Sequence, residues 1–109
     1  MSIRIRPEIK ALEDTIISTR RDIHQHPELA FDEHRTSKLV ADRLESMGFE
    51  VQRGIGKTGV VGTLHSKGKG KTIALRADMD ALPMQETSDI SYKSKNDGIM
   101  HASGHDGHT

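Results

Sequence analysis

Two helical patterns in the first half of the chain, followed by short strand-like segments, constrain the fold more than any other feature. Apolar residues between positions 8 and 25 recur mostly three, four and seven apart, which predicts one amphipathic helix. These residues are Ile9, Leu12, Ile16 and Ile23. A second helix is predicted from Glu33 to Met47, and Gly48 is a fitting end because glycine accepts the left-handed conformation.

Three segments after Gly48 have the composition of strands. They are Phe49–Gln52, Val60–His65 and Thr72–Ala77, and residues 66–71 between the last two predict a hairpin turn. Residues 54–59 (GIGKTG) predict a turn-rich linker, because they lack the lysine spacing of a phosphate-binding loop. Residues 84–100 predict a loop with a short strand near Ile90–Tyr92 and a turn at Asn96–Gly98. The expected class is α/β, with two helices followed by strands of a mixed sheet.

Composition excludes several classes of function. The 16 basic and 16 acidic residues cancel, so no overall field attracts nucleic acid or an anionic membrane. Cysteine is absent, which excludes disulfides and thiolate metal sites. No apolar run approaches the ~18 residues of a membrane span, and the first residues lack the core of a signal peptide. We therefore expect a cytoplasmic protein without nucleic-acid or membrane partners.

The most chemical stretch is His101–His108 (HASGHDGH). His101, Ser103 and His105 alternate along the chain, and His108 follows His105 by three, so a helical turn would bring the last two together. Imidazole and carboxylate groups at this spacing favour a divalent metal site over a polar tail. The site is incomplete by itself, because a catalytic zinc usually needs about three protein ligands.

Two further pairs of polar residues each have a metal-related and a purely structural interpretation. Asp78 and Asp80 follow a predicted strand and would share one side of extended chain. They could orient a metal ligand or tune a proton carrier, or they could cap a polar turn. His24 and His26 precede Pro27, where a helix should end, and capping of free carbonyls is favoured over metal binding.

Three blocks in order resemble the M20 family of metallopeptidases and amidohydrolases, in its hippurate hydrolase and N-acyl-amino-acid amidohydrolase branch. The first block is residues 20–51 (RRDIHQHPELAFDEHRTSKLVADRLESMGFEV). The second combines residues 56–64 (GKTGVVGTL) and 73–86 (IALRADMDALPMQE). The third is residues 92–109 (YKSKNDGIMHASGHDGHT). The resemblance spans nearly the whole chain.

The resemblance implies a hydrolase with two zinc or manganese ions that cleaves the amide bond of an N-acyl amino acid, a small-molecule substrate. It implies that the positions of Ser103 and His105 are metal ligands, and that Asp78 and Asp80 support the site from behind the ligands. A glutamate would act as general base. The fold implied is the N-terminal part of a zinc-peptidase-like catalytic domain.

Two departures from the family pattern limit this interpretation. Serine stands at position 103, where the branch has cysteine, and a neutral hydroxyl binds metals less well than a thiolate. Family members also continue well beyond residue 109, so residues 1–109 are expected to be an inactive N-terminal portion of the catalytic domain. The general base, the remaining ligands and the lid or dimerisation domain would lie outside it, and the parent would be a homo-oligomer if that domain pairs subunits.

Other functions remain open at this point. The chain could be a non-catalytic remnant, or a small metal-binding or interaction module. It could also derive from another M20 branch, such as the N-acetyl-diaminopimelate deacetylases. For the N-terminal portion of a catalytic domain, exposed apolar surface is expected where later helices would pack, and with it marginal stability or self-association.

Overall fold

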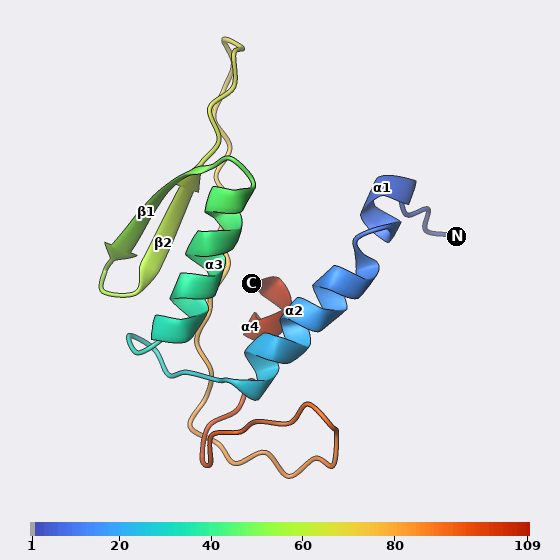
Figure 1. The fold of residues 1–109 in the computed structure, drawn as a ribbon, viewed down its shortest axis with the longest axis vertical. Coiled ribbons are helices and arrows are strands. Elements are labelled where there is room, and N and C mark those ends of the chain that lie inside the picture. The colour runs from blue at the N-terminus through green and yellow to red at the C-terminus, as the bar shows by residue number, and fades with distance from the viewer. Residues whose placement is uncertain (1) are drawn as a thin grey trace.

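The computed structural model describes residues 2–109 and combines four helices with one hairpin (Figure 1). In chain order the elements are α1 (Pro7–Lys10), α2 (Glu13–Gln25), α3 (His34–Ser46), β1 (Glu50–Ile55), β2 (Gly59–Thr63) and α4 (His105–His108). The α/β class expected from the sequence is confirmed.

The first predicted helix is broken rather than continuous. α1 ends at Lys10 and α2 begins at Glu13, with a turn at Ala11 and Leu12. The Leu12 N–H donates to the Ile9 carbonyl at 3.0 Å, a three-residue spacing that tightens the chain locally. Ile9 and Leu12 are each half exposed, so little tertiary packing supports an unbroken helix here.

The second helix and the hairpin form one small layer. α3 matches its predicted bounds closely, and Gly48 follows it with φ of +89°, as the sequence predicted. β1 and β2 pair antiparallel with Val51 opposite Gly62, and α3 packs on both strands. A side chain at Gly62 would stand 3.0 Å from Leu44 of α3, so the absence of one lets the helix approach the strand.

The hairpin uses a different turn from the one predicted. Residues 56–58, inside the predicted linker, connect β1 to β2. The strand expected at Thr72–Ala77 is not formed, and no backbone hydrogen bond joins it to another segment of the described chain. Ile73 and Leu75 are 85% and 96% exposed, because β2 already pairs with β1 and no second strand lies alongside. The sheet in residues 2–109 is therefore two-stranded and antiparallel rather than mixed.

The predicted short strand at Ile90–Tyr92 is also wrong. Residues 91 and 92 form a turn, and the pairing nearby is an isolated bridge between Leu82 and Met100. The two residues exchange N–H to carbonyl hydrogen bonds of 2.9 and 3.0 Å. This bridge closes the base of the loop formed by residues 84–98 (Figure 1).

The connector between α2 and α3 attaches that loop to the helices. Gln25, Pro27 and Glu28 offer their carbonyls to Lys95, Asn96 and Ala81, respectively, at 2.8–2.9 Å. The Glu28 carboxylate accepts the N–H groups of Arg35 and Thr36 at the start of α3. An acidic group at a helix N-terminus binds free N–H groups and complements the helix dipole. The connector thus fixes three segments relative to one another.

Apolar burial across residues 2–109 is sparse. The buried hydrophobic residues are Ile23, Ala41 and Ala81. The radius of gyration is 15.8 Å, against about 13 Å for a compact chain of this length. The accessible surface is 8508 Å², against about 6,000 Å² for a compact monomer of this mass. The large exposed apolar surface expected from the sequence is confirmed. Within the described residues, no helix is long and apolar enough to cross a membrane.

Candidate functional site

The histidine stretch folds into the short helix α4. Gly104 precedes it with φ of +96°, a conformation that favours glycine, and its carbonyl accepts the N–H groups of Gly107 and His108. The rings of His105 and His108 lie 6.2 Å apart between centroids. The helical turn suggested by their spacing is therefore present.

His105 is held by one of the two predicted acids. Its Nδ1 lies 2.9 Å from Asp80 Oδ1 and 3.0 Å from the Asp80 carbonyl oxygen. Both are acceptors, so Nδ1 carries the proton and donates it, which leaves the Nε2 lone pair free. Histidines that bind metals commonly donate their other ring N–H to a carboxylate or carbonyl in this way. The arrangement fits a metal ligand.

Asp78 lies on the other side of His105. Its carboxylate is 3.8 Å from Nε2 and 2.8 Å from the guanidinium of Arg76. Its carbonyl accepts the Thr109 hydroxyl at 2.8 Å, which attaches the acidic segment to the end of α4. Both acids therefore lie beside His105, although 25 or more residues separate them from it in the sequence.

Ser103 fits a metal less well. It is exposed, and it supplies a neutral hydroxyl where the resemblance implies a thiolate. Within residues 2–109, no group of three or more histidine, cysteine, aspartate or glutamate side chains is arranged to hold a metal ion. His105 with its two acids is thus a partial donor set.

A second polar cluster lies beneath α4 and was missed by the sequence reasoning. His24 Nδ1 lies 2.9 Å from Asp106 Oδ2, and His24 Nε2 lies 3.0 Å from Glu86 Oε1. All three residues are buried, with exposed fractions of 5%, 4% and 5%. We call these three residues the polar junction. Their separations of 62 and 82 residues left no local pattern to find.

The outer partners of the polar junction satisfy its carboxylates. Burial alone would raise the pKa of Glu86, but hydrogen bonds from the Ser88 hydroxyl, the Ser94 N–H and His24 outweigh burial and lower it. Asp106 also pairs with Arg20 of α2 at 3.3 Å. The Glu86 carboxylate is therefore stabilised in its ionised form.

The connector histidines take two different roles. His26 Nδ1 lies 2.8 Å from the Asp22 carbonyl in the last turn of α2, so the predicted capping role is confirmed for His26. The same prediction is wrong for His24, whose ring turns into the interior and bonds side chains from two distant segments. For His24, hydrogen bonds to the two buried carboxylates replace the expected capping of carbonyls at the end of α2.

His101 is buried without hydrogen bonds. Its exposed fraction is 4%, and neither ring nitrogen has a partner within the part of the chain that the structure describes. Burial, with a smaller contribution from His24 and His105, lowers its pKa below the usual 6.5 despite the nearby Asp106 carboxylate. His101 is therefore neutral at pH 7.

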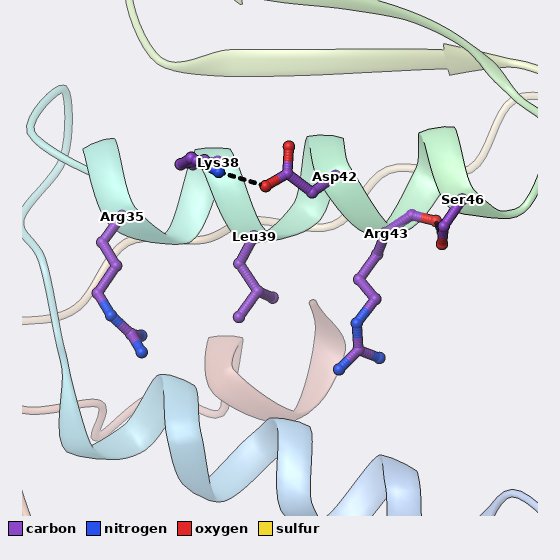
Figure 2. Close-up of a pocket in the computed structure, with 6 residues that line it drawn as sticks. All are labelled: Arg35, Lys38, Leu39, Asp42, Arg43 and Ser46. Atoms are coloured by element: carbon purple, nitrogen blue, oxygen red, sulfur yellow. Dashed lines mark hydrogen bonds and ion pairs between the residues drawn. The ribbon is translucent and has the colours of Figure 1, made fainter.

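Two hollows border the helices. One of about 520 Å³ lies along α3 and is lined by Arg35, Lys38, Leu39, Asp42, Arg43 and Ser46. Figure 2 shows Arg35, Leu39 and Arg43 extending from the side of α3 that faces α2 and α4, whereas Lys38 pairs with Asp42. No candidate site residue lines this hollow. A second hollow, of about 340 Å³, lies between α2 and α3 and reaches Asp106 and His108.

Known proteins resemble this chain in sequence and structure. Residues 74–109 match the family model described as peptidase family M20/M25/M40. Thermostable carboxypeptidase 2 of Saccharolobus solfataricus is 54% identical over 96% of this chain and 27% of its own length. Hippurate hydrolase of Campylobacter jejuni is 55% identical over 94% of this chain and 27% of its own.

A solved structure resembles the fold as well. The crystal structure of a Bacillus subtilis dinuclear metal binding peptidase from the M20 family superposes with a TM-score of 0.82 at 45% identity. The match covers 89% of this chain and 27% of that one. The chain thus spans about a quarter of the length of the relatives it matches. In sequence and in fold, this chain resembles part of the members of the M20 peptidase family.

Proposed function

We propose that residues 1–109 contribute part of a metal-dependent amidohydrolase site that cleaves the amide bond of N-acyl amino acids. The observation that carries the proposal is the pairing of His105 with Asp80, which leaves Nε2 available to a metal. The names of the relatives support the reaction: one is a hippurate hydrolase and another a carboxypeptidase. Both names describe cleavage of an amide whose nitrogen belongs to an amino acid.

His105 is the metal ligand in this proposal, and Asp80 orients it. By accepting a hydrogen bond from the Nδ1–H group, Asp80 fixes the tautomer and the direction of the ring, and it raises the basicity of Nε2. Asp78 adds negative charge 3.8 Å from Nε2, which favours a cation beside it. A divalent ion, zinc or manganese, would supply Lewis-acid activation of water and of the substrate carbonyl.

Ser103 is a weak second ligand in this proposal. Serine would offer a neutral oxygen in place of a thiolate, so the site should hold zinc less tightly than a cysteine-containing relative. The remaining ligands and the general-base glutamate would come from sequence that the relatives have outside the matched quarter. Residues 1–109 alone should therefore not turn over substrate.

A chimera tests the proposal in a complete site. Residues 1–109 would replace the matching segment of the Campylobacter jejuni hippurate hydrolase, and hydrolysis of N-benzoylglycine would be followed with added zinc or manganese. We expect metal-dependent turnover that His105→Ala abolishes and Ser103→Cys increases. His108→Ala, an exposed neighbour on the same helix, is the matched control and should retain activity.

Three outcomes would contradict parts of the proposal. A folded chimera whose metal-dependent activity survives His105→Ala would remove His105 from the ligand set. A folded chimera that binds neither metal, while the parent hydrolase does, would favour the alternative that this chain is a non-catalytic module. Equal zinc affinity of the chimera with and without Ser103→Cys, by chelator competition, would show that position 103 is not a ligand.

A further inference from the structure

His24 lies outside the candidate metal site but touches both segments that build it. Asp80 belongs to the segment that runs on to Glu86, and His105 belongs to α4 together with Asp106. His24 bonds Glu86 through one ring nitrogen and Asp106 through the other. One imidazole from α2 therefore bridges the acid-bearing segment and the histidine-bearing helix.

The chemistry of this bridge excludes a metal-binding role for His24. A carboxylate lies 2.9–3.0 Å from each ring nitrogen, so both nitrogens are occupied by the polar junction. Neither nitrogen is left to bind a metal. The ring is also 5% exposed, so it does not reach a substrate.

Neighbouring side chains fix the orientation of the His24 ring between its two carboxylates. The Tyr92 ring meets the His24 ring edge-on at 5.7 Å between centroids, and Arg20 adds a second cation to Asp106. Ser88 and Ser94 occupy the remaining acceptor positions of Glu86. A buried imidazole with a carboxylate on each side resists rotation, because breaking either contact leaves a buried polar group without its hydrogen-bond partner.

We propose that His24 is the positioning residue of the site: by fixing Glu86 and Asp106 at a set separation, it holds Asp80 and His105 within hydrogen-bonding distance. This inference rests on the proposed function, since it assigns His105 as the ligand being positioned. The effect of His24 on the relative placement of α4 and the acidic segment depends on the polar junction alone and does not require a metal. Loss of His24 should free α4 to move relative to the acidic segment and so lengthen the Asp80–His105 contact.

The test uses the 109-residue chain, the chimera and two readouts. Nitrogen-15 NMR of the histidine rings reports the tautomer of His105 directly, and competition with a chromophoric chelator reports zinc affinity. In the wild-type chain we expect the His105 ring to carry its proton on Nδ1, which lies beside two acceptors of Asp80. In His24→Gln we expect His105 of the chain to populate both tautomers, and the zinc affinity of the chimera, whose site is complete, to fall by about 10- to 100-fold, the usual cost of losing an outer partner.

Two control variants separate positioning from general stability. His65→Gln removes an exposed histidine that pairs with Glu50 at 2.8 Å, so it deletes a histidine–carboxylate contact elsewhere. Arg20→Gln removes the other cation beside Asp106 while leaving the His24 bridge. Both should keep the wild-type His105 tautomer. If His24→Gln unfolds the chain, Glu86→Gln loosens one side of the bridge only and should give a partial tautomer change.

The outcomes distinguish this inference from the proposed function. An unchanged His105 ring in a folded His24→Gln chain overturns the positioning role, even if zinc binding is normal. Zinc binding that is absent from both the chain and the chimera defeats the metal site. The tautomer readout still decides what His24 does in that case, because it needs no metal.

Discussion

The α3–hairpin layer and the polar junction are stabilised in opposite ways. The layer joins segments that are neighbours in sequence, and its helix meets its strands through apolar side chains and a glycine. The junction joins segments 62 and 82 residues apart through three buried charged side chains. Local patterning therefore forms the scaffold of this chain, whereas distant charge pairing aligns the candidate site.

Removal of Asp106 should have the largest effect on stability. Asp106→Ala leaves His24 and Arg20 without a shared partner, and breaking a buried ion pair costs about 3–5 kcal/mol. Urea unfolding followed by circular dichroism measures the loss. Asp89→Ala, an exposed acid in the loop, is the control and should change little. A cost for Asp106→Ala equal to that of the control would show that the junction does not stabilise the chain.

Overpacking of the α3–hairpin layer should cause the second-largest loss of stability. Ala41 of α3 is fully buried, so Ala41→Leu forces three further carbons into closed space at a cost of about 1–3 kcal/mol. The same urea titration reports it. Ala11→Leu, in the exposed turn between α1 and α2, is the matched control. If Ala41→Leu costs more than Asp106→Ala, apolar packing dominates both regions and the contrast between them fails.

The third effect is confined to acid pH. The folded pKa of Glu86 lies below its ordinary value of 4.5, so its contribution to stability is present above that value and is lost as pH falls through the folded pKa. In Glu86→Gln, the free energy of unfolding should fall less steeply with decreasing pH when it is measured between about pH 3 and pH 6. Glu50→Gln, an exposed glutamate that also pairs with a histidine, is the control. The same pH dependence of unfolding in Glu86→Gln and in the wild-type chain would contradict the prediction.

The smallest effect is expected on the surface of the layer. Arg53 of β1 contacts Asp42 and Glu45 of α3, each at 2.9 Å, but all three side chains are exposed. Solvent and salt screen such pairs, so Arg53→Ala should leave the unfolding midpoint almost unchanged and reduce its dependence on salt. A loss comparable to that of Ala41→Leu would show that the ion pairs, not the apolar contacts, join α3 to the hairpin.

The same contrast explains what the sequence could predict. Apolar periodicity placed α3 within about a residue of its bounds, because helix amphipathicity is a local signal. The alternation of apolar and polar residues located the first two strands. The hairpin turn was predicted at residues 66–71 instead of 56–58, because both segments contain glycines that favour turns. Residue type and spacing singled out Asp78, Asp80 and His105 as candidates, and the resemblance implied their roles. His24 was misread because the carboxylates that draw it inward are far away in sequence.

The unpaired segment Thr72–Ala77 has a practical consequence for handling the protein. Free backbone groups beside Ile73 and Leu75 offer an edge to which another copy could add a strand. Lys67, Lys69 and Lys71 precede this edge and Arg76 lies within it, so like charges face one another when two copies approach. Salt screens that repulsion over about 10 Å at 0.1 M. Concentrated stocks should therefore stay clearer in low-salt buffer, and light scattering should rise as sodium chloride is added.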